Sequence, residues 1–443
     1  MIRLVMLIAL LSAFLALGPT TARAAAPSSE EVQQLRKEID LLRKQNAASE
    51  ARIQALENKL TDVQQAQEKK DQELDAKIAQ GTPGTAAGAA RDALDNWFGD
   101  NRFIVTGYGS GTFDWERNGG TSTFGASVNP IFLYRVTDRV LFEAEPEIEL
   151  ESTGETNVNL EYAQADIVLN DYATLVGGKF LIPFGDFIEH LHPAWINKLV
   201  SKPMPYVEGD EGGLMPFSDV GAQVRGGTRL FDTEGVDLDY TVFASNGPRF
   251  EDSALGTPAI GTPFVTNNVD INQGKGFGAR IALYPIPLSM EMGRLRIGAS
   301  TYDGTWQGKG DPWFTAWGVD FAYQLDELDL RGEYLQTRRQ LIGQSTDHRD
   351  GWYLQAGYKL SRLGFEPLNK VELVARWSGL QQHALAADDT LGTEARPGNP
   401  RELAFGVDYW LTPSVVGKFE YDWAFGEKVR NDHMLRAQIA VGF

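Results

Sequence analysis

Glutamate occupies every second position of one short segment, and mostly apolar residues fill the positions between. In an extended strand successive side chains point to opposite faces, so the glutamates share one face. This acidic set comprises Glu143, Glu145, Glu147 and Glu149. In a water-filled passage such a column selects ions by its field and by their desolvation, without making or breaking a bond.

Arginine follows the same alternation in later segments. If the apolar face of each segment points outward, eight arginines point inward: Arg225, Arg229, Arg280, Arg294, Arg296, Arg331, Arg376 and Arg436. Acidic and basic columns on different walls predict a transverse field across an enclosed passage. The alternative is that each charge pairs with a neighbouring strand and only keeps the interior wet.

The longest link between apolar segments, residues 183–219, combines aromatic residues with many charges. Its candidate functional residues are Asp186, Glu189, His190, His192, Lys198 and Lys202. A link with this much apolar content is expected to pack inside something, and the interior of a barrel is available. We interpret it as a constriction loop; the alternatives are an extracellular lid and a contact between chains.

The residue types needed for catalysis are poorly represented. The chain has no cysteine, no Gly-x-Ser-x-Gly turn, no phosphate-cradling glycine loop and no histidine spacing typical of zinc. His190 and His192 could share a metal, but an isolated His-x-His seldom does, and His348, His383 and His433 are scattered. We therefore expect no enzyme activity, no metal and no cofactor.

Sixteen segments with alternating apolar and polar residues follow one another from residue 102 to residue 443. Their centres span 103–115, 123–135, 139–151, 157–169, 172–182, 220–230, 236–244, 276–284, 294–302, 313–325, 328–336, 352–360, 371–377, 403–411, 415–425 and 434–443. Tight links such as 326–327 alternate with mostly longer ones such as 245–275, 337–351 and 379–401. Short turns at one end and longer loops at the other are typical of bacterial membrane barrels. The pattern predicts an all-β transmembrane barrel of about 16 antiparallel strands.

The last nine residues, Leu435 to Phe443, alternate without a break and end on an aromatic residue. This is the pattern of a lipid-facing barrel strand, although an edge strand of a soluble sandwich could share it. The net charge of −19 argues against nucleic acid as a partner.

The first hundred residues have a different composition. Residues 1–24 combine an early arginine, an apolar run and a small-x-small site, which predicts an export signal peptide. Residues 25–80 carry a seven-residue apolar repeat that predicts an α-helical coiled coil, and residues 81–101 predict a flexible linker. Branched residues at one core position and leucine at the other favour two strands in such a coil.

Residues 177–185, Gly-Gly-Lys-Phe-Leu-Ile-Pro-Phe-Gly, resemble the junction between strand and constriction loop in the phosphate-selective porin O and P family. The sixteen-strand plan and terminal Phe443 are also similar to that family, and the coiled coil resembles that of trimeric dicarboxylate-uptake porins. The resemblance implies a homotrimer, with a dimer as the alternative. It also implies a basic ladder in the channel, but only the junction can be matched residue by residue.

Together these features predict an outer-membrane porin of a Gram-negative bacterium, with its coiled coil in the periplasm. Small hydrophilic or charged solutes, including anions, would diffuse passively through a charge-lined pore. Lipid, small ions and copies of the same chain are the expected partners. The alternative function is structural, with the coiled coil tethering the outer membrane to the cell wall.

Overall fold

The computed structural model describes residues 102–150, 154–207, 213–230, 236–250, 264, 274–286, 292–306, 312–340, 346–383, 399–427 and 432–443. The chain divides into two compact units, Met1–Gly81 and Thr82–Phe443. The predicted signal peptide, coiled coil and linker lie outside the described residues.

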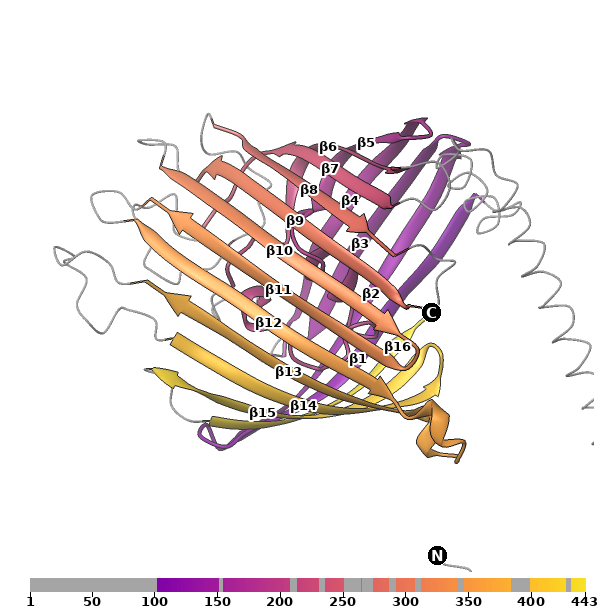
Figure 1. Ribbon diagram of the computed structural model, residues 1–443, viewed down its shortest axis with the longest axis vertical. Helices are drawn as coiled ribbons and strands as arrows, with labels where there is room; N and C mark the ends of the chain where they lie inside the picture. The colour runs from indigo at the N-terminus through magenta and orange to yellow at the C-terminus, as the bar shows by residue number, and fades with distance from the viewer. Residues whose placement is uncertain are drawn as a thin grey trace, which may run out of the picture. The chain divides into compact units, whose positions relative to one another are not determined.

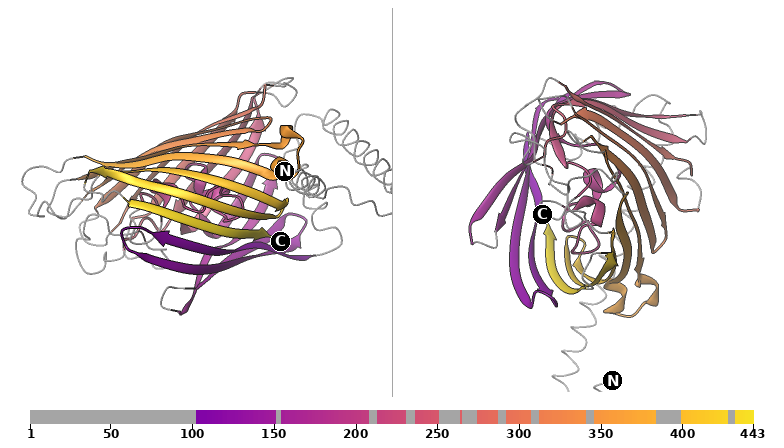
Figure 2. Two further views of the ribbon diagram at one scale, coloured as in Figure 1. Left: turned by 90° about the horizontal axis from the view of Figure 1, so that it is seen from below. Right: turned by 90° about the vertical axis from the view of Figure 1, so that its left-hand side faces the viewer.

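Sixteen antiparallel strands form a closed barrel in which each strand pairs with its neighbours in sequence and β1 pairs with β16 (Figure 1 and Figure 2). The predicted barrel is confirmed. The strands are β1 (Phe103–Glu116), β2 (Thr121–Thr137), β3 (Val140–Leu150), β4 (Thr156–Asn170), β5 (Ala173–Leu181), β6 (Ser218–Arg229), β7 (Asp237–Ser245), β8 (Gly276–Tyr284), β9 (Arg294–Thr305), β10 (Trp313–Leu325), β11 (Leu328–Arg339), β12 (Asp347–Lys359), β13 (Val371–Gln382), β14 (Asn399–Thr412), β15 (Val415–Glu427) and β16 (Asp432–Gly442).

The two ends of the barrel sequence meet at the seam. The backbone N–H of Phe443 donates to the carbonyl of Gly107 at 2.9 Å, and the N–H of Gly107 donates to Phe443 at 3.0 Å. The alternating residues of β16 therefore continue the barrel wall, and closure leaves no unpaired strand edge.

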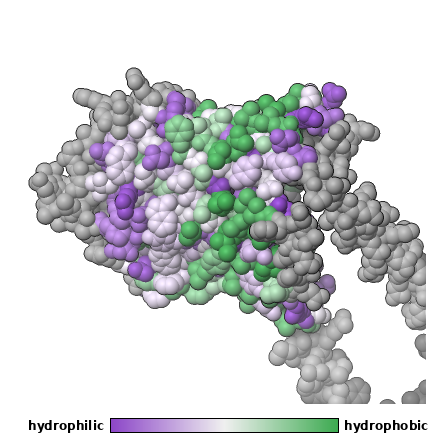
Figure 3. All heavy atoms as spheres, turned by 45° about the horizontal axis from the view of Figure 1, so that its top comes forward, coloured by the Kyte–Doolittle hydropathy of each residue, from purple (hydrophilic) through white to green (hydrophobic). Residues whose placement is uncertain are grey.

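The alternation of residue types explains why the wall has two different faces. In β10, Trp317 and Val319 are each 47% exposed on the outside, whereas Phe314 and Asp320 are buried on the inside. Figure 3 shows hydrophobic residues gathered in a band across the strands on the face in view, with hydrophilic residues toward the ends. Among the described residues, no helix is both long enough and apolar enough to cross a membrane.

Several strands extend beyond their predicted ends. β12 begins at Asp347, five residues before the predicted centre, and β13 continues to Gln382. The links predicted at 337–351 and 379–401 are correspondingly shorter. The extensions consist largely of polar residues and therefore show no apolar alternation in the sequence. They are still strands, because backbone hydrogen bonds continue beyond the apolar band.

The chain between β5 and β6 folds into the barrel interior, where Figure 2 shows it within the ring of strands. The described residues of this internal loop, 182–207 and 213–217, contain a π-helical turn, η1 (Phe187–Leu191), and a 3-10 turn, η2 (Met204–Tyr206). Two further 3-10 turns, η4 (Ser361–Leu363) and η5 (Leu368–Lys370), join β12 to β13. The internal loop packs on inward aromatic residues of β5, β7, β9, β10 and β12, including Phe180, Phe243, Tyr302 and Tyr353.

Candidate pore constriction

Glu333 of β11 holds the start of the internal loop. Its carboxylate accepts hydrogen bonds from the backbone N–H groups of Asp186 and Phe187, at 3.1 and 2.8 Å. It also accepts from the hydroxyls of Tyr206, at 2.5 Å, and Tyr353, at 2.7 Å. A buried carboxylate with four donors is well satisfied, so this contact fixes the loop against one wall.

Glycine is required beside this carboxylate. Gly185 has φ +65°, and a Cβ built there would lie 2.1 Å from Oε2 of Glu333 and 2.5 Å from the Tyr206 hydroxyl. The Gly185 N–H donates to the hydroxyl of Ser300 on β9 at 3.1 Å. The last residue of the Gly177–Gly185 segment therefore allows the chain to turn close to the wall.

The second half of the loop is bound to the wall formed by β13 and β15. Arg376 donates to the carbonyl of Ser201 at 2.9 Å, and Glu420 accepts from the Ser201 N–H at 3.0 Å. Lys418 donates to the carbonyl of Ala194 at 2.5 Å and to that of Asn197. Arg376 was predicted to line the pore, but its side chain is 0% exposed because the loop covers it.

The histidines of the loop contact different partners. His192 Nε2 lies 3.1 Å from Glu161 of β4, and its Nδ1 lies 2.6 Å from the carbonyl of Ile188. His190 Nδ1 lies 2.9 Å from Asp186. A metal shared by His190 and His192 is therefore unsupported. Since β4 lies across the barrel from β11 and β13, these contacts carry the loop across the lumen.

Asp186 is the charged centre of the loop. Burial by itself would raise its pKa, but the hydrogen bonds to His190 and Arg296 outweigh burial and hold the pKa of Asp186 well below its usual range. Arg331 contributes a further contact at 3.8 Å. Asp186 therefore remains ionised at neutral pH and binds the loop to the arginines of β9 and β11.

A cavity of about 350 Å³ lies between the internal loop and the wall from β4 to β9. Its charged lining includes Glu189 and His190 of the loop and Arg225, Arg280 and Arg296 of the wall. Burial raises the pKa of Glu189 more than the nearby charges of His190 and Arg280 lower it. Acidic and basic groups therefore both line the cavity, and three guanidinium groups form part of its surface.

Each of these three arginines is paired with a carboxylate. Arg280 binds Asp320 with two hydrogen bonds of 2.6 and 3.0 Å. Arg296 contacts Asp186 and lies 3.7 Å from Asp320. Arg225 contacts Asp166 and lies 3.7 Å from Glu143. Acidic and basic residues therefore interleave here, rather than forming two separated walls as predicted.

The remaining predicted arginines lie in three kinds of environment. Arg331 pairs with Asp329 at 2.6 Å, and Arg436 lies 2.7 Å from Asp422 and 3.1 Å from Asp114. Arg229 forms an exposed pair with Asp237 at 2.8 Å. Arg294 is exposed and forms no ion pair with any described residue.

The acidic column of β3 is uneven. Glu143 accepts a 2.7 Å hydrogen bond from Gln164, and Glu145 is 2% exposed and accepts one of 3.3 Å from Asn129. Glu147 is partly exposed and Glu149 is exposed, and both have partners. The predicted column therefore includes one glutamate, Glu145, that does not face open water.

Two lysines of the loop are likewise held close to protein groups. Lys198 binds Glu372 and lies 3.7 Å from Asp329. The Lys202 ammonium lies 5.0 Å from the ring centre of Phe217, at cation–π distance. Both predicted loop cations are thus engaged with neighbouring groups.

Four residues that hold the loop were not predicted from the sequence: Glu161, Glu333, Lys418 and Glu420. Asp320, which binds Arg280 and Arg296 of the wall, was not predicted either. Except for Glu161, each lies at a regular inward position of its strand, so the alternation of side chains could have placed it in the lumen. Glu161 is skipped in the pairing of β3 with β4, where the alternation is interrupted. The loop partners of these residues could not be found from alternation, because the loop has no regular periodicity.

No protein-family model matches the sequence, and no curated protein matches it. Solved structures do match. OmpF of Salmonella typhi, in complex with daunomycin, has a TM-score of 0.51 and 12% identity over 77% of this chain and 97% of that chain. An anion-selective porin from Comamonas acidovorans has a TM-score of 0.47 and 9% identity over 77% and 99%. OccK5 (OpdH) of Pseudomonas aeruginosa has a TM-score of 0.44 and 11% identity over 77% and 98%.

These structural neighbours are outer-membrane porins. At such identities the likeness concerns the fold alone, and of these three structures OmpF has the TM-score above 0.5. It agrees with the closed barrel of sixteen strands.

Proposed function

We propose that this protein is an outer-membrane porin through which small hydrophilic solutes and ions diffuse passively. One observation carries the proposal: a loop bound to opposite walls crosses the interior of a closed barrel beside a cavity of about 350 Å³ that is lined by charged residues. The apolar outer face suits lipid and the charged inner face suits water.

The mechanism needs no reaction. A solute entering the narrowed lumen exchanges part of its hydration shell for contacts with guanidinium and carboxylate groups, and leaves because each contact is weak. The arginines of the cavity offer hydrogen-bond donors to anionic solutes. Their paired carboxylates reduce the net charge that a passing ion meets.

The finer parts of the proposal rest on the sequence. The Gly177–Gly185 segment supports kinship with the phosphate-selective O and P porins, and the heptads of residues 25–80 support a periplasmic coiled coil. We propose three chains per assembly, from the same resemblance. The competing function is a tether in which the coiled coil binds the cell wall and conductance is incidental.

Planar-bilayer recording of the purified oligomer in a KCl gradient tests the proposal, with phosphate and a dicarboxylate as competing ions. We expect stepwise openings in multiples of three, a reversal potential that reports charge preference, and block by an ion that binds in the lumen. Heat-modifiable migration in electrophoresis shows whether the barrel is folded. If the folded barrel shows no conductance, the porin function is rejected and the tether function is favoured.

A further inference from the structure

Two histidines far apart in the sequence lie opposite each other on β12 and β13, at the end of the barrel where the longer links join the strands. We call this end the loop end. His348 is the second residue of β12, and His383 follows the last residue of β13. The backbone N–H of His383 donates to the carbonyl of His348 at 3.0 Å. Their imidazole rings stack with centroids 4.0 Å apart and planes inclined by 18°.

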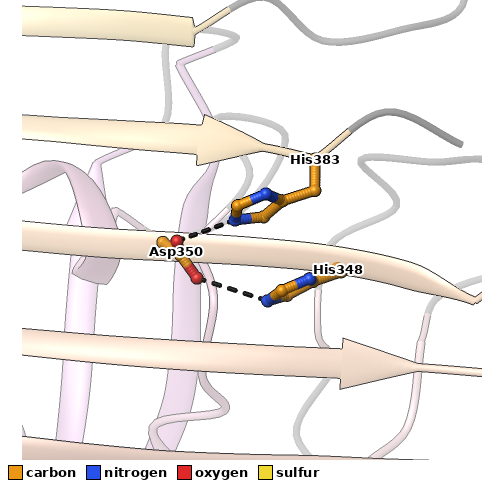
Figure 4. Close-up of side chains that lie close together, drawn as sticks. All are labelled: His348, Asp350 and His383. Carbon is orange, nitrogen blue, oxygen red and sulfur yellow. Dashed lines mark hydrogen bonds and ion pairs between the residues drawn. The ribbon is translucent and has the colours of Figure 1, made fainter.

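Asp350 lies beside both rings (Figure 4). Its Oδ2 is 2.8 Å from Nε2 of His383, and its Oδ1 is 3.5 Å from Nε2 of His348. One ligand atom from each of the three residues lies within 4.8 Å of the other two. In a tetrahedral zinc site with bonds of about 2.0–2.2 Å, ligand atoms are about 3.4 Å apart, so small side-chain rotations would bring these three into range.

One buried atom of this cluster forms no hydrogen bond with any described residue. It is His348 Nε2, which Asp350 Oδ1 faces in the ion pair at 3.5 Å. A buried polar atom without a hydrogen bond needs an explanation, and an ion between the imidazole and the carboxylate would supply one.

The surroundings orient the carboxylate. Gln336 Nε2 donates to Asp350 Oδ1 at 3.1 Å, and Gln336 Oε1 accepts from the indole of Trp317 at 3.3 Å. Hydrogen bonds of this kind hold metal ligands in place from outside the coordination sphere.

The cluster lies on the outer face of the wall and is separate from the pore. His348 and Asp350 share a face of β12 with Leu354, which is 49% exposed, whereas Tyr353 on the other face belongs to the interior cluster. The neighbouring outward residues are Trp352 and Trp377, packed edge to face at 4.5 Å. Tryptophans are typical of the interface between membrane and water, and the cluster lies beyond them toward the loop end.

We propose that His348, Asp350 and His383 form a binding site for a divalent transition-metal ion, with Zn²⁺ as the representative ligand. Two imidazole nitrogens favour late first-row metals over Mg²⁺ and Ca²⁺, which take oxygen ligands. Three protein ligands leave a fourth position for water or an external donor.

The test uses the full-length folded oligomer, prepared without a polyhistidine tag and stripped with EDTA. Isothermal titration with Zn²⁺ gives stoichiometry and affinity, and the visible absorption of bound Co²⁺ reports four-coordinate geometry. We expect one ion per chain, and affinity at least about tenfold weaker in His348→Ala, His383→Ala and Asp350→Asn.

His433→Ala is the matched control, because His433 instead stacks on the ring of Tyr421 on β15, 5.8 Å away. It should bind Zn²⁺ as the natural chain does. Heat-modifiable migration shows that every variant is folded. Absence of saturable binding by the natural chain, or equal binding by the three ligand variants, would overturn the site. Neither result depends on conductance, so the site and the porin can fail separately.

Discussion

Arg296 joins the wall of the barrel to the internal loop and also lines the cavity. It contacts Asp186 of the loop and lies 3.7 Å from Asp320 of β10. A paired arginine still contributes to the local field, because its removal leaves the carboxylates uncompensated. Arg294, two residues earlier, is exposed and forms no ion pair with any described residue, so it contributes a single screened charge.

Replacing Arg296 by Ala should shift the reversal potential toward cations. A unit charge about 4 Å away in water is worth about 1 kcal/mol, or about a fivefold change in the permeability ratio. Arg294→Ala should shift it in the same direction but less. The control is Arg362→Ala, since Arg362 forms exposed pairs with Asp326 and Glu327 at a turn. If Arg296→Ala leaves the reversal potential unchanged, the cavity does not lie on the ion route.

His192 makes the contact between the loop and β4 sensitive to pH. Burial lowers the pKa of His192, but the hydrogen bond to Glu161 and the charges of Glu161 and Glu145 outweigh burial and the opposing charge of Lys202. The net pKa is raised above the ordinary value of 6.5. The pairing therefore stabilises the loop fully below pH of about 6.5, and the stabilisation disappears as the pH rises through the folded-state pKa.

Hydrogen exchange of the loop, corrected for intrinsic rates, should show less protection at pH 9 than at pH 6. In His192→Gln the protection at pH 6 should already be low, and it should change less with pH. His433→Gln is the control, because His433 lies far from the loop in sequence and contacts Tyr421. Parallel pH curves for the natural chain and His192→Gln would show that the ion pair does not hold the loop.

The internal loop depends on its first turn. Gly185 has a positive φ, and Glu333 binds the next two backbone N–H groups, so the wall and the loop approach too closely for a side chain. The loop is therefore an element positioned by buried polar contacts as much as by apolar packing.

Gly185→Ala should release the start of the loop from Glu333. The left-handed conformation alone costs a non-glycine residue about 1–2 kcal/mol, and the overlap with Glu333 adds to it. We expect faster proteolysis of the loop and a larger single-channel conductance. Gly177→Ala is the control from the same segment, because a Cβ there meets nothing within 4 Å. Equal conductance and proteolysis in both variants would contradict the proposed role of the loop.

The molecule combines a barrel that closes on itself with an amino-terminal region of different composition. Closure through β1 and β16 gives every strand two neighbours, so the barrel needs no second domain to complete its sheet. The predicted coiled coil at residues 25–80 would therefore act on assembly or attachment and leave the pore itself unchanged.

Deleting residues 25–80 should weaken the oligomer while leaving the conductance of each pore unchanged. Cross-linking and native mass measurement over a temperature range would follow the assembly. An oligomer of unchanged size and stability would show that barrel surfaces alone hold the chains together. Release from envelopes with and without lysozyme tests the tether, since equal release would count against attachment to the cell wall.

Much of the barrel could be predicted from the sequence, because lipid and water impose opposite demands on alternate residues. That constraint determined the number of strands, their approximate centres and the inward direction of Arg296 and Glu143. It failed at the start of β12, where Asp347 to Asp350 are polar and yet extended. Beyond the apolar band both faces of a strand meet polar surroundings, so alternation disappears.

The candidate site was less predictable. The alternation of side chains along the strand predicted that Arg376 points into the interior, but it could not predict that the loop covers it. Nothing in the sequence linked Glu333 to Gly185 or His348 to His383. Such pairs depend on strand register, on the tilt of neighbouring strands and on the path of an irregular loop. Register, tilt and loop path are determined when backbone hydrogen bonds close the barrel, which brings residues distant in sequence within a few ångströms of each other. A local pattern of residue types contains no information about such contacts.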